Sequence, residues 1–270
     1  MAIPGIIAVF LISQLYAAKN YTDQNFPSYS GNYAVETSQA GEVITVVSYN
    51  IWFGEEIDQA VLELREIKSQ SEADIILLQE MGEVGTDKIA RELQMNYVYF
   101  PAAVEPTYHK NFGNAILSRW PIVDPKKLIL PHKSLSNRMN RIATRATIRI
   151  QGTEILVYSI HTESIFTLPR FREDQYRAVL DDRGSDARQV IIGGDFNSFT
   201  QADAEQIEEI YEQAGFIRAS EVSGNTIFKH GVGFPSDHIF AKGFVVKEAG
   251  KLQKAAASDH LPIWVTLVLQ

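Results

Sequence analysis

Cysteine is absent from the 270 residues of this chain. Disulfide bonds, zinc–thiolate sites and cysteine nucleophiles are therefore excluded, and the redox state of the compartment is left open. Positive charge is also scarce, because 33 acidic residues outnumber 25 lysines and arginines and give a formal net charge of -8. Such a protein does not adhere broadly to nucleic acid or anionic lipid, although a bound cation or a local basic patch would permit either substrate.

Uncharged hydrophobic sequence is concentrated at the N-terminus. Residues 2–18 carry no charged side chain, and their length fits a signal-peptide core or a short membrane anchor, although no lysine or arginine precedes them. We therefore expect an exported or membrane-anchored protein that associates with a membrane through residues 1–18. The alternative is that this segment packs on the folded domain and does no targeting, which predicts a cytoplasmic protein.

Linker-like sequence is limited as well. Residues 19–42 are polar, rich in Ser, Tyr, Asn, Gln and Gly, and without apolar periodicity, which predicts a polar linker. From residue 43 to residue 270 no low-complexity or Pro/Gly-rich segment interrupts the chain. We expect these residues to form one domain, since their number and the ordinary globular composition of the chain suffice for a single core.

Within residues 43–270, strand and helix patterns alternate. Apolar runs predict strands over residues 43–49, 74–79, 114–118, 142–150, 154–160, 190–193, 236–241 and 262–269. Helical periodicity is present over residues 56–70, 84–94, 170–180 and 201–214. The turn at residues 151–153 joins two strands as a hairpin, which argues against a purely parallel sheet. The mixture predicts an α/β (α+β) fold in which two packed sheets carry helices on the outside.

One stretch, residues 190–198, combines a buried strand with polar groups at its end. The apolar run Val190–Ile192 is followed by Gly193 and Gly194, and then by Asp195 and Asn197. On an extended backbone, residues two positions apart point the same way, so the acid and the amide would share one target. We interpret the glycines as leaving room for a phosphate and its water beside Asp195.

Polar side chains able to bind a metal or move a proton recur at the other strand ends. Each has an ordinary explanation as a turn former, cap or core histidine, but strand ends in a layered fold converge on one edge, where sites are built. The set comprises Asn50, Glu80, His161, Asp237, Asp259 and His260 in addition to Asp195 and Asn197. Their joint occurrence favours a functional site over turn chemistry.

These residue types predict phosphoester chemistry that depends on a hard cation. Oxygen ligands without thiolates favour Mg2+, with Mn2+ as the other choice, and Glu80 and Asp259 with Asn50 beside them would form the site. The cation and a histidine would neutralise charge on phosphoryl oxygens while an acid or a histidine activates water. Asp237 is available to hold the second nitrogen of a histidine.

The sequence segments that contain these residues, taken in chain order, resemble the endonuclease/exonuclease/phosphatase (DNase I-like) superfamily. The resemblance covers about residues 43 to 270 and rests on Ser48–Trp52, Leu77–Glu80, Gly113–Arg119, Ser159–Glu163, Gly194–Asn197, Ser236–Phe240 and Ser258–Pro262. It implies a four-layer sandwich of two packed mixed β-sheets flanked by helices. It also implies a Mg2+-dependent hydrolase of phosphoester bonds, above all phosphodiesters.

The resemblance implies a role for each polar strand end. By this resemblance, Glu80 matches the metal-binding glutamate, and Asn50 lies near metal and phosphate. His161 binds a phosphoryl oxygen, while Asp195 and Asn197 orient or activate water. Asp259 and His260 form the terminal Asp-His pair, whose histidine is oriented by Asp237. Whether Asp195 or His260 is the general base stays open. The family usually has an aromatic residue after the acid at position 237, and we interpret His238 there as a strand or lining residue.

The substrate is not specified by these residues. The loop over residues 105–111 lies where the family contacts substrate, so Tyr108 and Asn111 are candidates, with His109, Asn114 and Arg141. Arg141 belongs to a basic run with Lys133, Arg138 and Arg145, which either touches phosphate or is a solvated strand edge.

Two classes of substrate and one other class of function remain. The net charge of -8 gives a nuclease little help, and a phospholipid headgroup or small phosphoester fits an N-terminal anchor better. A non-catalytic phospho-ligand-binding module that kept the fold is the alternative, although it predicts the loss of a central residue and none is lost. No obligate protein partner is expected.

Overall fold

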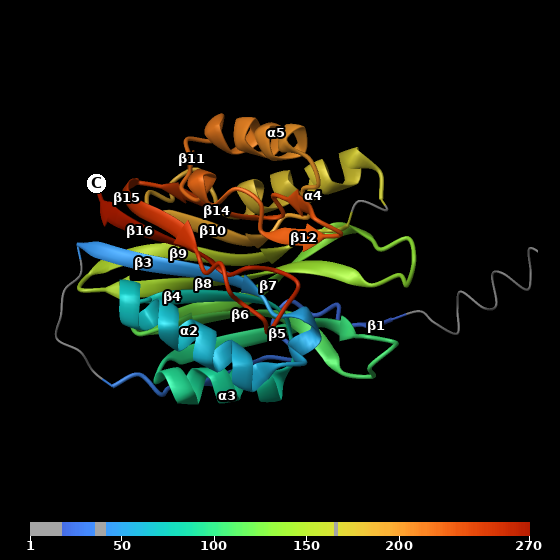
Figure 1. Cartoon of the computed structure of the whole chain (residues 1–270), viewed down its shortest axis with the longest axis horizontal. Coiled ribbons are helices and arrows are strands. Elements are labelled where there is room, and N and C mark those ends of the chain that lie inside the picture. Colours follow the sequence, from blue (N-terminus) through green and yellow to red (C-terminus); the bar gives the residue numbers. More distant parts are fainter. Residues whose placement is uncertain (1–17, 36–41, 165–166) are drawn as a thin grey trace, which may run out of the picture.

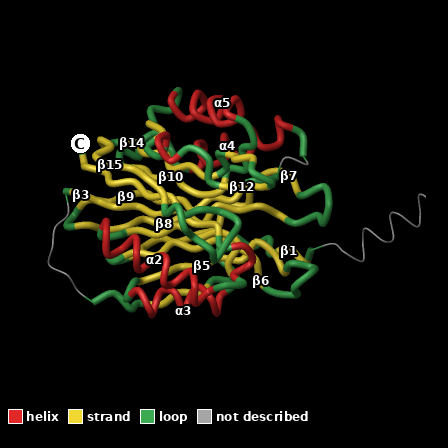
Figure 2. The backbone as a smooth tube through the Cα atoms, viewed as in Figure 1, coloured by secondary structure: helices red, strands yellow, loops and turns green. Residues whose placement is uncertain are grey.

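Two β-sheets pack face to face, and helices cover both outer faces (Figures 1 and 2). The structure is a computed structural model in which residues 18–35, 42–164 and 167–270 are described. Its four layers confirm the predicted α/β fold of two mixed sheets flanked by helices. Apart from Ala18, the predicted signal or anchor segment lies outside the described residues.

The first sheet is centred on the parallel pair β3 (Val43–Asn50) and β4 (Ile75–Met81). Their apolar runs are almost wholly buried, as expected of strands covered on both faces. The strand order is β1-β5-β6-β4-β3-β16-β15, with β2 also paired to β5. The remaining strands are β1 (Lys19–Asn20), β2 (Tyr29–Gly31), β5 (Asn96–Val104), β6 (Asn111–Ser118), β15 (Phe244–Lys251) and β16 (Ile263–Leu269).

The second sheet has the order β11-β14-β10-β9-β8-β7. Its strands are β7 (Ile122–Lys133), β8 (Asn140–Ile150), β9 (Thr153–His161), β10 (Val190–Asp195), β11 (Ile217–Arg218) and β14 (Asp237–Lys242). β9 and β10 are parallel and β14 is antiparallel to β10, so that Asp195 is level with His161 on one side and Asp237 on the other. A separate hairpin is formed by β12 (Ile227–Lys229) and β13 (Val232–Phe234).

The helices bury one apolar face each against a sheet. α2 (Ile57–Ser71) and α3 (Glu83–Leu93) pack on the first sheet, and α4 (Pro169–Asp182) and α5 (Gln201–Glu212) pack on the second. Short 3-10 turns occur at η1 (Trp52–Gly54) and η2 (Glu221–Ser223). None of the helices in the described ranges is long and apolar enough to cross a membrane.

The core between the sheets is what brings the two halves of the chain together. Aliphatic side chains from β4, β6, β9 and β10 meet there, among them Leu77, Ile116, Val157 and Ile191, all fully buried. Because the strand alternation is fixed by this core, a one-residue slip would turn the whole apolar set outward. The same constraint fixes which edge of the sandwich receives the polar strand ends.

Residues 19–35 differ from the predicted polar linker. β1 and β2 add to β5 in antiparallel register, and the Asn20 side chain donates to the Arg138 carbonyl (2.9 Å) and accepts from the Asn140 amide (2.7 Å). Residues 19–20 and 29–31 are therefore part of the first sheet. Strands of two and three residues carry no measurable apolar alternation, so the sequence pattern did not reveal them.

Candidate active site

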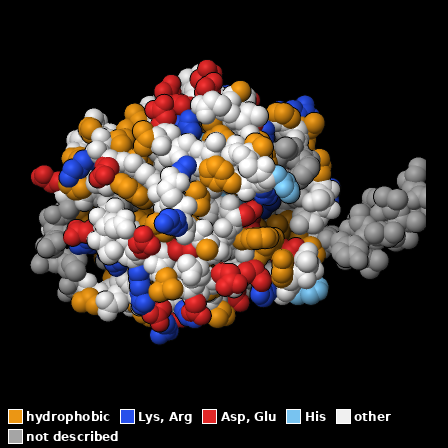
Figure 3. Space-filling model, in the orientation of Figure 1, with side chains coloured by type: hydrophobic (Ala, Val, Ile, Leu, Met, Phe, Trp, Pro, Cys, Tyr) orange, Lys and Arg blue, Asp and Glu red, His pale blue; other side chains and the backbone are white. Residues whose placement is uncertain are grey.

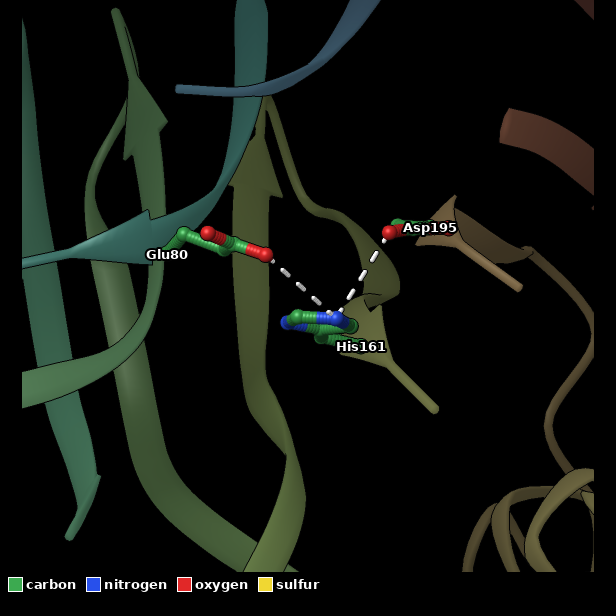
Figure 4. A group of neighbouring side chains, drawn as sticks. All are labelled: Glu80, His161 and Asp195. Carbon is green, nitrogen blue, oxygen red and sulfur yellow. Dashed lines mark ion pairs between the residues drawn. The ribbon is translucent and has the colours of Figure 1, made fainter. Parts of the chain in front are cut away.

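Polar side chains from both sheets meet at the edge where β3, β4, β9 and β10 end. Glu80, His161 and Asp195 point toward one another (Figure 4), and one potential ligand atom from each lies within 4.8 Å of the others. A second such group joins Asp195 to Asp237 and His260. The two groups share Asp195, so the structure brings five of the predicted site residues into one cluster.

The carboxylate of Asp195 is the centre of this cluster. Its Oδ2 atom accepts a hydrogen bond from Asn50 Nδ2 (3.0 Å) and lies 3.5 Å from His161 Nε2 and 3.8 Å from His260 Nε2. Its Oδ1 atom accepts from the Asn197 amide and from Ser236 Oγ, both at 2.8 Å. One oxygen is thus fixed by donors while the other faces two imidazoles. Burial raises the pKa of Asp195, and the charge of His260 opposes the rise.

The glycines before Asp195 serve packing, not substrate, and this part of the sequence interpretation is wrong. A Cβ at Gly193 would lie 2.7 Å from Leu77 Cδ1 in the core between the sheets. Gly194 has φ of +151°, and a Cβ there would collide with the Ile160 carbonyl of the neighbouring strand. Both positions are buried within β10. The missing side chains therefore allow the strands to approach closely.

Asn197 reaches Asp195 by a turn and not by strand alternation. β10 ends at Asp195, and Asn197 has φ of +52°. Its amide donates to Asp195 Oδ1, and its Nδ2 atom donates to the Thr162 carbonyl (3.0 Å). The predicted convergence of the two side chains occurs, but through the local side-chain–backbone bond typical of Asp in turns.

Glu80 is aimed by a distortion in β4. It has φ of +59°, and the pairing with β6 shifts register between Leu78 and Met81. Such a bulge re-aims a side chain, and left-handed backbone at a non-glycine residue is characteristic of functional sites. The Glu80 carboxylate accepts from Asn50 Nδ2 (3.3 Å) and from the Phe53 amide (3.3 Å). Burial raises the pKa of Glu80, against the lowering effect of nearby Arg141.

The donor set around Glu80 fits a hard cation. Asn50 donates to both Glu80 and Asp195 through Nδ2, while its buried Oδ1 atom has no partner among the described residues. A buried carbonyl oxygen left unpaired beside two carboxylates lacks a positive charge to satisfy it. Carboxylate and amide oxygens are the ligands that Mg2+ and Mn2+ prefer. Glu80 and Asn50, with Asp195 beside them, are the residues that would hold the ion.

His260 is held as a cation. Asp237 Oδ2 lies 2.8 Å from His260 Nδ1, and it also accepts from Thr226 Oγ1 (2.6 Å). Burial lowers the pKa of His260, but Asp237 and Asp195 outweigh it and raise that pKa to about 10. The imidazolium therefore presents its Nε2–H toward Asp195. Asp237 therefore contacts the histidine that the resemblance assigns to it, and its orienting role stays a prediction.

His161 is the opposite case. Burial and the charge of Arg141 push its pKa well below the ordinary histidine value, so the ring is neutral. Arg141 Nη1 lies 3.5 Å from His161 Nδ1, and because a guanidinium only donates, Nδ1 is the acceptor and Nε2 carries the proton. That proton faces Glu80 and Asp195. The site therefore contains one neutral and one charged imidazole, which suits two different tasks.

Asp259 stands apart from this cluster. Its side chain is 30% exposed, its Oδ2 atom faces Lys229 Nζ at 3.4 Å, and its Oδ1 atom is 4.0 Å from His260 Nε2. The structure does not bring Asp259 within the distance that joins Glu80, His161 and Asp195. Its predicted metal-binding role therefore stays a prediction.

The predicted substrate residues divide into two kinds. Asn114 is buried and donates to the Ile142 and Ser159 carbonyls (2.9 and 3.0 Å), so its side chain ties β6 to the second sheet. Asn111 is likewise engaged, since it donates to Glu83 Oε2 (3.0 Å) and accepts from the Tyr21 hydroxyl (3.0 Å). The side chains of Asn114 and Asn111 are therefore both engaged in hydrogen bonds with other residues of the protein.

Arg141 and Tyr108 keep capacity for a ligand. The Arg141 guanidinium lies between His161 and Glu163 (3.4 Å), and its buried Nε atom has no partner among the described residues. Tyr108 is 41% exposed and packs on Phe53, with ring centroids 4.8 Å apart. A cavity of about 530 Å3 lies next to the Tyr108 loop and is lined by Phe53, Gly82, Glu83, Val84, His109 and Lys110 among others.

Sequence reasoning missed several supporting residues. Thr226 on the loop before β12 holds Asp237 in place, and no motif at position 226 signals this. Ser236 was part of the repeated Ser-Asp-His pattern, but its bond to Asp195 needs the β10–β14 register to be seen. His238 is buried, with Nε2 at 2.8 Å from Ser198 Oγ, so it lies away from the cluster as a strand residue.

The comparisons with known proteins place this geometry in a family. The sequence profile of the endonuclease/exonuclease/phosphatase family matches residues 47–260, which is most of the chain. The chain belongs to this family. The curated UPF0294 protein of Vibrio cholerae is 28% identical to the chain over 131 residues, which cover 47% of the chain. The chain therefore spans less than half (45%) of the length of that relative.

Solved structures of other proteins share the fold. The Danio rerio TDP2 structure with a single-strand DNA product superposes with a TM-score of 0.66 at 16% identity, covering 83% of this chain and 98% of TDP2. The mannosyl-6-phosphatase of Bacteroides thetaiotaomicron superposes with a TM-score of 0.63 at 20% identity, covering 84% of this chain and 100% of that protein. At these identities the likeness establishes the fold alone.

Proposed function

We propose that this family member is a Mg2+-dependent hydrolase of phosphodiester bonds. The observation that carries the proposal is the placement of Asp195 Oδ2 among Asn50, His161 and His260, at 3.0 to 3.8 Å, with Asp237 behind His260. This carboxylate oxygen accepts from the Asn50 amide and lies between a neutral and a charged imidazole, so a proton acceptor and two donors meet at one point. Hydrolysis of a phosphoester needs these groups together.

Each residue has a task in that reaction. Asp195 accepts the proton of the attacking water, whose oxygen forms the new bond to phosphorus as the ester oxygen leaves. His161 donates its Nε2–H to a phosphoryl oxygen, and the His260 imidazolium stabilises the added negative charge. Arg141 lies beside His161 and offers further donors. A bound Mg2+ would supply Lewis-acid charge stabilisation next to Glu80 and Asn50.

The test is hydrolysis of bis(p-nitrophenyl) phosphate by the purified full chain with Mg2+ or Mn2+. We expect turnover that a chelator abolishes, and a loss of about 10²-fold or more in Asp195→Asn and His260→Gln. Glu205→Gln removes an exposed carboxylate on α5 and serves as the matched control. No turnover with several metals and several phosphoester classes would overturn the proposal. Tight binding of a phosphodiester without turnover would favour the non-catalytic binding module instead.

A further inference from the structure

Exposed hydrophobic side chains gather around the active-site edge of the sandwich. Six of them, on five separate segments, are between 41% and 77% exposed: Val84, Tyr108, Leu135, Leu168, Phe228 and Val232. We call them the apolar rim. Isolated exposed hydrophobics are ordinary, and Figure 3 shows them scattered among charged side chains, but a set that surrounds one polar site marks a binding surface.

The topology explains why five segments meet there. Val84 follows the end of β4, and Tyr108 lies in the β5–β6 loop that returns to it. Leu135 is in the β7–β8 turn, level with the end of β9, and Leu168 lies between β9 and α4. The β12–β13 hairpin reaches the same edge through a bridge between Ile227 and His260.

Cations accompany the apolar rim although the chain as a whole is acidic. Lys133 and Arg138 flank Leu135, and both are exposed. Lys229 follows Phe228 within the same hairpin, and Lys110 lies within 6.0 Å of the Tyr108 ring. Two of these lysines are paired with acids, Lys110 with Glu55 and Lys229 with Asp259, both at 3.4 Å, which leaves Lys133 and Arg138 as the exposed cations next to Leu135. Exposed apolar side chains next to basic ones suit binding to a phospholipid bilayer, because its apolar interior lies below a layer of anionic phosphates.

The uncharged N-terminal sequence joins the domain at this same edge. The Ala18 amide donates to the Asn137 carbonyl in the β7–β8 turn (2.8 Å). Ala18 also packs in a small cluster with Phe112 and Met139, and the Phe112 ring lies 5.7 Å from His161. Residues 2–18, which carry no charge, are therefore covalently attached beside the active site and not at the opposite end of the sandwich.

We propose that the apolar rim docks on an anionic phospholipid bilayer and presents the active site to membrane phosphodiesters. This inference rests on the proposed function for its substrate, but not for the docking itself. Water would add to the phosphorus of a lipid headgroup, and one ester oxygen would leave with a proton. Nucleic acid would instead be recognised by stacking on aromatic rings. Four of the six rim residues are aliphatic, and they stay in the majority when Trp52, exposed next to the end of β3, is added to the set.

The absence of cysteine makes docking directly measurable. Leu135→Cys and Val232→Cys each place a single thiol on the apolar rim of the full chain, where an environment-sensitive fluorophore is attached. Leu62→Cys on α2 and Val245→Cys on β15 are matched controls, because both residues are exposed hydrophobics outside the rim. With vesicles of phosphatidylcholine and phosphatidylglycerol, we expect a blue shift and quenching by brominated lipid at the two rim positions only.

Three results would overturn docking. The first is that the labels at the apolar rim do not respond to vesicles. The second is that all four labels respond alike, because this would indicate that the chain is tethered to the vesicle without a fixed orientation. A response to a DNA oligonucleotide but not to vesicles would assign the edge to nucleic acid.

Activity separates docking from the proposed function. The double variant Leu135→Ser, Val232→Ser should hydrolyse vesicle phospholipid at least ~10-fold more slowly than the unaltered chain, because two apolar contacts with the bilayer are lost. It should hydrolyse soluble bis(p-nitrophenyl) phosphate at the unaltered rate. A chain inactive on both substrates contradicts the proposed function, whereas the label responses still decide docking. If the unaltered chain and the double variant are both active on the soluble diester but hydrolyse vesicle phospholipid equally slowly, the membrane phosphodiester is not the substrate.

Discussion

Asp237 is buried away from solvent, and its carboxylate favours the charged form of His260. The side chain is buried, and its Oδ2 atom is shared between His260 Nδ1 and the Thr226 hydroxyl. Replacing the carboxylate with an amide keeps the volume and removes the charge that favours imidazolium. The residue therefore acts through His260, as a positioning residue.

We expect Asp237→Asn to lower kcat by about 10²- to 10⁴-fold, since an orienting carboxylate sets both the tautomer and the charge of its histidine. KM should change much less, because Asp237 does not face substrate. Thr226→Val, which removes only the second bond to the same carboxylate, should cost about 10-fold or less. Steady-state kinetics on a soluble phosphodiester measure both. Equal losses in the two variants would show that the loop, and not the charge, matters.

The resemblance gives His161 and His260 different roles, but the residues themselves did not indicate which imidazole is neutral and which is charged. Both follow or precede apolar strands, and both belong to recurring polar strand ends. Their difference arises because Arg141 of β8 lies against one ring and Asp237 of β14 against the other. Strand pairing, not local sequence, decides which neighbour each imidazole has.

Strands that obey alternation or form apolar runs were predictable, and edge strands were not. β3, β4, β9 and β10 are central, so their apolar runs identified both the strands and the polar residues at their ends. β7 contains prolines and lysines because it is an edge strand, where an unpaired backbone tolerates both. β15 is an edge strand too, and β5 includes Pro101 at a register shift. β7 and β15 were missing from the sequence prediction because they are edge strands. β5 is an interior strand, and it was missed although its run is almost wholly buried.

For the glycines of β10, the sequence indicated the correct position of a close approach to the backbone but not the group that approaches. The sequence indicated that something approaches the backbone closely at Gly193 and Gly194. The approaching groups are Leu77 and the Ile160 carbonyl, which only the packing of two sheets reveals.

A substitution at Gly194 tests that packing. Gly194→Ala should destabilise the fold by more than about 2 kcal/mol, because φ of +151° is unfavourable for alanine and the added Cβ meets the backbone of β9. Gly184→Ala is the control: φ there is also positive, at +74°, but nothing lies within 4 Å of the new atom. We expect the control to cost about 1 kcal/mol. Urea unfolding monitored by tryptophan fluorescence compares them, and equal costs would refute a steric role for Ile160.

The site joins the two halves of the sandwich. Asn50 and Glu80 come from the first sheet, and His161, Asp195 and Asp237 come from the second. Buried charges at such a junction must compensate one another, because an uncompensated charge in the interior is costly. His260, as the cation between Asp195 and Asp237, contributes to holding the sheets together as well as to chemistry. The stability of the whole fold is therefore linked to its protonation.

This linkage has a defined sign in the presence of a chelator. The pKa of His260 is about 10 in the folded protein against 6.5 ordinarily, so the folded state binds more protons between these values. The contribution of His260 is complete below pH 6.5 and is lost as pH rises through 10. The buried Lys127 acts in the opposite direction, since burial lowers its pKa from 10.5 to about 8 and its cost disappears at high pH.

A comparison of the unaltered chain with His260→Gln isolates the histidine, because both proteins contain Lys127. We expect the unaltered chain to have the larger free energy of unfolding near pH 6.5, and the difference to shrink steadily toward pH 10. Urea titrations across this range in a chelator measure it. The reason is that glutamine takes up no proton, so only the unaltered chain loses a favourable charge between Asp195 and Asp237 as the pH rises. A difference that is independent of pH would mean that His260 stabilises the junction by packing alone, and that its imidazolium is not the state the fold selects.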